Sequence, residues 1–106
     1  ALTMAKRHRM RYYHGFAHRL LGGILMKNKL DEAVFHFEKS ISIFREIKAE
    51  NELAMAYVGF GRLHKEKGQI AKSRKYLTKA LEIFERLGTL LEPDKVREIL
   101  AELSKV

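Results

Sequence analysis

The chain contains the stretch Asn28–Phe44, which reads NKLDEAVFHFEKSISIF, and a second version of it forty residues later, Gly68–Phe84, which reads GQIAKSRKYLTKALEIF. Three aligned pairs are identical, and most other apolar positions keep their size or polarity. The identical pairs are Lys39/Lys79, Ile43/Ile83 and Phe44/Phe84. A recurrence at this spacing predicts a stacked helical-repeat scaffold, an architecture that commonly holds a partner.

Length and composition predict one all-α domain. The chain has 106 residues, a single proline (Pro93) and no cysteine. A chain of this size can bury a real core. Without cysteine there is neither a disulfide framework nor thiolate chemistry, so we expect a cytoplasmic location. We expect no membrane partner, because no apolar run approaches the roughly 20 residues that cross a bilayer.

The first residue bears on the extent of the chain. Ala1 is not an initiator residue. We therefore expect either that Met4 is the true start behind added residues, or that the chain is an excerpt of a longer protein.

Positive charge is concentrated at the beginning of the chain. The formal net charge is +8, and residues 1–29 hold seven Lys and Arg without any Asp or Glu. The remainder nearly balances, at 14 − 13 = +1. The basic opening includes Lys6, Arg7, Arg9 and Arg11. Such asymmetry indicates a surface that faces a partner or phosphate groups, or a solvated helix start.

Apolar spacing is helical almost throughout and predicts five helices, over about residues 10–27, 30–48, 51–67, 69–87 and 93–104. Asn28, Gly68 and Gly88 are expected to end helices, because Gly and Asn tolerate the left-handed conformation. Asn51 is a candidate N-cap, and Pro93 suits the first position of the last helix. Short loops require successive helices to pack antiparallel.

Each predicted helix has an apolar side that we expect to face inward. The residues are, in helix order, Tyr13, Ala17, Leu20, Leu21 and Ile24; Ala33, Val34, Phe37, Ile41, Phe44 and Ile47; Leu53, Ala56, Tyr57, Phe60 and Leu63; Ile70, Ser73, Leu77, Ala80, Leu81, Phe84 and Leu87; and Val96, Ile99, Leu100 and Leu103. One hairpin leaves an apolar flank uncovered, which the next hairpin hides from water.

The residues at these positions resemble the tetratricopeptide repeat. The second unit matches the motif with Tyr57, Phe60-Gly61, His64, Gly68, Ser73, Leu77 and Ala80, and the first with Ala17, Leu20-Leu21, Ile24, Asn28, Ala33, Phe37 and Ser40. The resemblance is to variants with longer helices, since the usual spacing is 34 residues. Leu21 stands where the motif prefers Gly, with Gly22 next to it, so close packing in the first hairpin is expected to shift by one residue.

The resemblance implies an α-α superhelix of two repeats, at about residues 10–48 and 51–88, with a capping helix at about 93–105, in one domain over residues 1–106. It also implies that ligands bind on a concave surface lined by the first helix of each unit. The polar positions that this alignment turns inward are His18, Arg19, Arg62, Lys65 and Glu66. Such a groove would favour an acidic or extended peptide, or an amphipathic helix.

Candidate chemistry along the chain is sparse. His14 and His18 lie four residues apart, but zinc needs three or four protein ligands, so we expect no metal site. His36 is isolated, and His64 is expected to be a packed, hydrogen-bonded core residue. No serine lies in the turn that a nucleophile prefers, and no glycine follows a strand to cradle phosphate. We therefore expect neither an enzyme nor a cofactor.

Three functions are compatible with these patterns. The first is a protein–protein interaction scaffold that binds a peptide or helix in a concave, basic groove. The second is a nucleic-acid-binding repeat that uses the basic opening, although no known nucleic-acid motif is present. The third is a self-associating spacer of a larger regulatory protein, because two repeats are few for a stable array and a homo-oligomer or neighbouring repeats would cover its ends.

Overall fold

The computed structural model describes the backbone of residues 2–88 and 92–103, and the side chains of residues 6–88 and 94–103. Within these ranges the chain forms five α-helices and no strand. They are α1 (Leu2–Leu25), α2 (Leu30–Glu46), α3 (Glu50–Glu66), α4 (Ile70–Leu87) and α5 (Glu92–Leu103). The all-α prediction is therefore confirmed.

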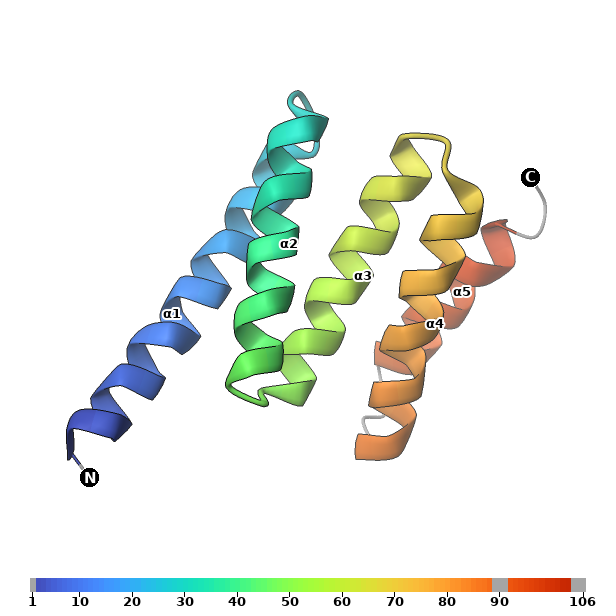
Figure 1. The fold of residues 1–106 in the computed structure, drawn as a ribbon. Coiled ribbons are helices and arrows are strands. Elements are labelled where there is room, and N and C mark those ends of the chain that lie inside the picture. Colours follow the sequence, from blue (N-terminus) through green and yellow to red (C-terminus); the bar gives the residue numbers. More distant parts are fainter. Residues whose placement is uncertain (1, 89–91, 104–106) are drawn as a thin grey trace.

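The helices pack in chain order as two antiparallel hairpins and a closing helix. Each helix contacts the next one along the chain, and α1 also touches α3. Figure 1 shows α1 to α4 side by side, with α5 behind α4. The molecule measures 51 × 33 × 18 Å, so it is a layer about two helices thick. This is the stacked, tetratricopeptide-like arrangement that the repeat predicted.

The ring of Phe37 joins the two hairpins. Phe37 lies on α2, is 2% exposed, and is held between Gly22 of α1 and Gly59 of α3. A Cβ atom at Gly22 would lie 2.8 Å from Phe37 Cδ2, and one at Gly59 would overlap the ring. Both helices can approach this ring only because these two positions lack a side chain.

The close packing of a glycine against a large side chain recurs within each hairpin. A Cβ atom at Gly15 would lie 2.9 Å from Phe44 Cε1, and one at Gly61 would lie 2.7 Å from Leu77 Cγ. Small residues on the first helix therefore receive large ones from the second, as the repeat motif requires.

The inward face of α1 is not the predicted one. Most of the residues expected inside are exposed, from 42% for Leu21 to 68% for Ile24. The residues that turn inward are Gly15 and Gly22, with the half-buried Tyr12, Leu25 and Met26. The physical reason is that the two glycines admit the Phe44 and Phe37 rings, whereas the bulkier apolar residues would hold the helices apart.

The position of close packing on α1 is displaced by one residue from the forty-residue spacing of the repeat. Gly22 occupies the place in the first hairpin that Gly61 occupies in the second, 39 residues later rather than forty. One position along a helix rotates a side chain by about 100°. The expected displacement of the close packing next to Leu21 is thus confirmed. The apolar stripe of α1 is exposed because α1 packs mainly on α2, whereas the equivalent face of α3 is covered by packing on both α2 and α4.

The other helices bury their predicted faces with one exception. The largest side chains of α2, α3 and α4 in this set are buried or half-buried, and Val96 and Leu103 of α5 are 1% and 2% exposed. Leu87 is the exception, because at 42% exposure it lies at the end of α4, beyond the reach of α3.

The helix ends agree with prediction at the glycines and differ at the asparagines. Gly68 and Gly88 both have a φ of 76° and end helices as expected. Asn28 does not adopt a positive φ; the non-glycine residue that does is Lys48, at 59°. Asn51 is not an N-cap, because Ala49 precedes the first residue of α3.

Three helices begin earlier than predicted, and one of them is α3, which starts at Glu50 rather than at residue 51. α1 starts at Leu2 rather than near residue 10, so the basic opening is helical (Figure 1). α5 starts at Glu92, one residue before Pro93. No helix within the described residues is long and apolar enough to cross a membrane.

Candidate binding groove

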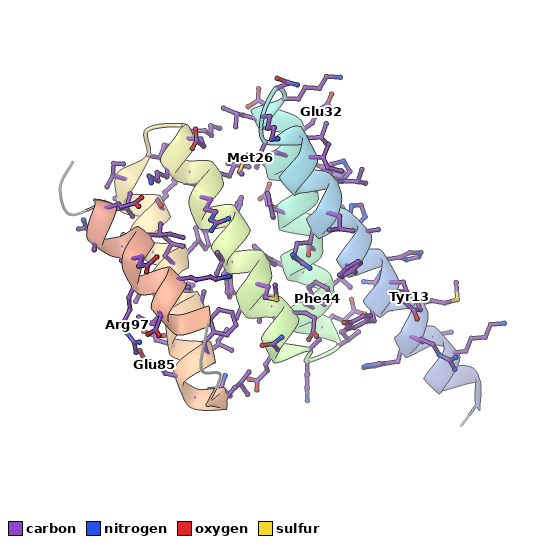
Figure 2. The ribbon with its side chains drawn as sticks, turned by 180° about the vertical axis from the view of Figure 1, so that it is seen from behind. Tyr13, Met26, Glu32, Phe44, Glu85 and Arg97 are labelled. Atoms are coloured by element: carbon purple, nitrogen blue, oxygen red, sulfur yellow. The ribbon has the colours of Figure 1, made fainter. Side chains whose placement is uncertain are left out.

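A groove of about 610 Å³ lies on the side of the molecule formed by the first helix of each hairpin and by α5. Figure 2 is seen from this side, with α1, α3 and α5 in front of α2 and α4. Its apolar lining consists of Leu20, Ile24, Met26, Phe37, Met55 and Val58. The Phe37 ring that joins the hairpins is therefore also part of the groove.

Four cationic side chains surround this apolar lining. They are Arg19, Lys27, Arg62 and Lys95, and no Asp or Glu is among the described residues that line the groove. None of the four has an ion-pair partner within the part of the chain that the structure describes. Arg19 stacks over the Phe16 ring at 5.2 Å, and its buried Nε has no hydrogen-bond partner among the described residues. The arrangement can attract anionic groups and accept an apolar side chain between them.

A second hollow of about 490 Å³ adjoins the groove, and both share Met26, Arg62 and Lys95. Its charges are mixed, because Lys65, Glu66, Glu98 and Glu102 also line it. Lys65 Nζ lies 2.8 Å from Glu102 Oε2, so this cation is already neutralised. The cationic part of the surface is therefore the main groove.

The structure brings together some of the predicted site residues and not others. Arg19 and Arg62 line the main groove, and Lys65 and Glu66 line the adjoining hollow with Arg62. His18 lines neither, since its Nδ1 lies 2.8 Å from Nδ1 of His36 on α2. The rotation of α1 explains this, because it turns position 18 toward the second helix.

The pair of His18 and His36 was not anticipated, because the two residues are 18 positions apart on different helices. Their rings stack with centroids 5.1 Å apart, and one nitrogen of the contact must donate a hydrogen while the other accepts it. Burial lowers the pKa of His18, and the nearby cationic groups, His36 first among them, lower it further. Among the described side chains, no group of three or more His, Asp or Glu could hold a metal ion.

His64 is the buried core residue that the repeat predicted. It is 5% exposed, and its Nδ1 lies 2.7 Å from Oε1 of Gln69. Its ring stacks on Tyr76, with centroids 5.5 Å apart. Burial lowers the pKa of His64.

The basic opening forms part of a rigid helix. Arg11 donates a hydrogen bond to Glu46 of α2 at 2.6 Å, so it ties α1 to α2. Lys6, Arg7 and Arg9 are exposed and have no ion-pair partner among the described residues. The structure thus separates one structural arginine from three outward cations.

Lys27 and Lys95 were not singled out from the sequence. Lys95 lies on the closing helix, which the repeat pattern presents as a cap rather than a ligand surface. The available signal was its position on the last helix, which follows two hairpins and so takes the place of the first helix of a third repeat.

Comparison with known proteins agrees with this architecture. The tetratricopeptide repeat family matches the chain over residues 13–86. The chain is also similar to "Protein KINESIN LIGHT CHAIN-RELATED 3" of Arabidopsis thaliana, at 25% identity over 84 residues. This alignment covers 77% of the chain but 13% of the relative, so the chain spans a small part of that protein's length. No solved structure matches significantly.

Tetratricopeptide repeats in general act as scaffolds that bind other proteins. Five helices in two hairpins and a closing helix, with a groove on the side of the first helices, form the expected architecture of such a scaffold. The chain therefore belongs to the tetratricopeptide repeat family.

Proposed function

We propose that this chain is a non-catalytic protein–protein interaction scaffold that binds an acidic peptide segment in the groove between α1, α3 and α5. The observation that carries this proposal is the set of four cations around an apolar lining, none of which has an ion-pair partner among the described residues. A lining of one charge sign raises the local concentration of oppositely charged ligands. An acidic segment would therefore be favoured over a neutral or basic one.

The lining also suggests the form of the ligand. One apolar side chain would rest against Phe37, Met55 and Val58, which come from α2 and α3. Carboxylates on either side of it would reach Arg19 on α1 and Arg62 on α3. Arginine is suited to this task because its planar guanidinium binds a carboxylate through two parallel hydrogen bonds.

The absence of a catalytic role belongs to the same proposal. The hydroxyl-bearing Ser40 and Ser73 are fully buried, and His64 is engaged by Gln69 in the core. No nucleophile and base lie together among the described residues that line the groove. A cytoplasmic location and an acidic protein partner complete the proposal.

A peptide-binding experiment tests the groove. The probes are fluorescein-labelled peptides in which two Glu flank a single Leu, Met or Phe, with Lys-flanked peptides of the same design for comparison. Anisotropy titrations compare the wild type with Arg62→Glu and with Arg74→Glu, an identical charge change on the exposed side of α4. We expect Arg62→Glu to weaken binding of the Glu peptides at least about tenfold, because it places a carboxylate against the ligand's own.

The control should stay within about twofold of the wild type, since its charge lies far from the site and is screened. Equal losses in the two variants would indicate a general charge effect and would remove the groove from consideration. The double variant Arg62→Glu/Lys65→Glu, which halves the positive charge of the main groove and makes the adjoining hollow strongly negative, should abolish binding of the Glu peptides.

Nucleic acid is the second candidate ligand, favoured by the exposed Lys6, Arg7 and Arg9 on α1. At about 100° per residue, Lys6 and Arg9 lie on one side of α1 while Arg7 lies about 100° from Lys6, so the three side chains spread over a wide arc and do not follow one phosphate track. A gel-shift assay with single- and double-stranded probes at modest ionic strength tests this candidate. Retardation at micromolar protein, lost in a Lys6→Glu/Arg7→Glu/Arg9→Glu variant, would favour it over the peptide groove.

A further inference from the structure

A stripe of apolar side chains runs along the outward side of α1. Its members are Met10, Tyr13, Ala17, Leu20 and Ile24, spaced by three, four, three and four residues. Met10 is 51% exposed, Tyr13 is 61% exposed and Ile24 is 68% exposed. This 3-4 spacing is the seam that one helix presents to another. Figure 2 labels Tyr13 on α1, far from the other hairpin.

The internal duplication identifies what such a stripe is built to receive. With the one-residue shift established above, Ala17, Leu20 and Ile24 correspond to Ala56, Gly59 and Leu63 of α3. Ala56 and Leu63 are fully buried, and Gly59 lies against Phe37 of α2. The exposed stripe of α1 is therefore the counterpart of the face with which α3 packs on a neighbouring helix.

Charge decides which kind of helix fits. No acidic residue occurs in residues 1–29, and Arg7 and Arg9 lie on either side of the stripe by helical spacing. Lys6 continues the line of the stripe toward the N-terminus. A second copy of α1 laid against this face would bring like charges together, which disfavours self-pairing. A helix with acidic residues beside its own apolar seam would instead form ion pairs on both flanks.

The same chemistry already holds α1 on its inner side. Arg11 of α1 pairs with Glu46 of α2 at 2.6 Å, next to the apolar contact of Tyr12 with Phe44. An acidic helix on the outer side would repeat this combination of apolar seam and flanking ion pair.

We propose that the outward stripe of α1 is a second binding surface, which adjoins the groove and receives an acidic amphipathic helix of a partner protein packed as α2 packs on α3. Met10 and Tyr13 belong to this surface alone, whereas Leu20 and Ile24 also line the groove. Substitutions at residues 10 and 13 therefore test the stripe without altering the groove.

The probe is a synthetic peptide of about three heptads with Leu at the seam positions, Glu on both flanks and Ala elsewhere, whose Glu residues keep it from pairing with itself. A matched peptide carries Lys in place of Glu. Anisotropy with the labelled peptides is measured for the wild type, for Tyr13→Asp, and for Phe35→Asp. Phe35 is a fair control because it is another exposed aromatic, 51% accessible on α2, and the substitution changes charge equally.

We expect the Glu probe to bind the wild type and Phe35→Asp alike, and to bind Tyr13→Asp at least about tenfold more weakly, because a large interface aromatic commonly contributes this much. Circular dichroism verifies that each variant is folded.

Three results would overturn the proposal. Equal binding by Tyr13→Asp and Phe35→Asp would show that the stripe is not the contact. Equal binding of the Lys probe would remove the acidic partner. If light scattering showed a dimer of the wild type and a monomer of Tyr13→Asp, the stripe would be assigned to a second copy of the chain.

Discussion

The two hairpins carry the same pattern but use their first helices differently. In the second hairpin, α3 places Gly61 against Leu77 of α4, and its large residue Phe60 is buried between Phe37 of α2 and Tyr76 of α4. In the first hairpin, Gly15 and Gly22 take the inner positions, and the large residues of α1 face solvent. The comparison teaches that the two first helices present equivalent faces, and that the apolar face is buried in α3, which packs between α2 and α4, but exposed in α1, whose main neighbour among the described helices is α2.

The largest effect is expected where both hairpins meet. Phe37→Ala removes the ring that Gly22 and Gly59 enclose, and should cost about 3–5 kcal/mol of unfolding free energy because a cavity remains between α1 and α3. Denaturant unfolding followed by circular dichroism measures this loss. Phe35→Ala, on the exposed side of the same helix, should stay within about 0.5 kcal/mol of the wild type. A cost near that of the control would mean that Phe37 does not join the hairpins.

Neighbouring glycines of α1 provide a sharper test of its rotation. Gly22→Ala places a Cβ atom 2.8 Å from the Phe37 ring and should cost about 1–3 kcal/mol. At Gly23 nothing lies within 4 Å of an added Cβ, so Gly23→Ala should stabilise the protein by about 0.5–1 kcal/mol through helix propensity. The same unfolding assay compares both variants. If the two changes had the same sign, the close approach of α1 at Gly22 would be disproved.

The smallest effect concerns histidines, one in each hairpin. The pKa values of His18 and His64 are both lowered, chiefly by burial. In the unfolded chain both histidines become protonated near pH 6.5, whereas in the native protein they become protonated only at a lower pH. The free energy of unfolding should therefore fall as pH drops through and below 6.5. The slope cannot exceed about 1.4 kcal/mol per pH unit for each group.

Urea unfolding between about pH 8 and pH 5 measures this dependence, because the midpoint follows the proton difference between the two states. His18→Asn should remove the contribution of the first hairpin to this slope, and His64→Gln should remove that of the second. A slope that neither substitution reduces would mean that other groups, such as carboxylates, govern the loss of stability.

Much of the fold could be predicted because its signals are local. Glycines at positions 68 and 88 end helices, and the apolar spacing of α2 and α4 repeats at forty residues. The face of α1 could not be predicted from apolar spacing, because a buried glycine adds nothing to a hydrophobic pattern while Leu20, Leu21 and Ile24 dominate it. The only clue was the glycine one position beyond the motif's preferred place.

The site was predictable to a similar degree. Arg19 and Arg62 line the candidate groove, as expected from their aligned positions on the first helix of each repeat, and their role in binding stays a prediction. His18 was misplaced, since its position depends on the rotation of α1. Its contact with His36 joins two helices, and a single sequence contains no pattern that indicates such a pair.

Thiol labelling of single-cysteine variants tests the rotation of α1 most directly, since the natural chain contains no cysteine. Ile24 and Leu63 are counterparts at the shifted register, yet they are 68% and 0% exposed. We predict that Ile24→Cys reacts within about tenfold of a free thiol, whereas Leu63→Cys reacts orders of magnitude more slowly because labelling must wait for opening of the core. Equal protection of both cysteines would contradict the account, because it would show that the apolar stripe of α1 is covered in the same way as the equivalent face of α3.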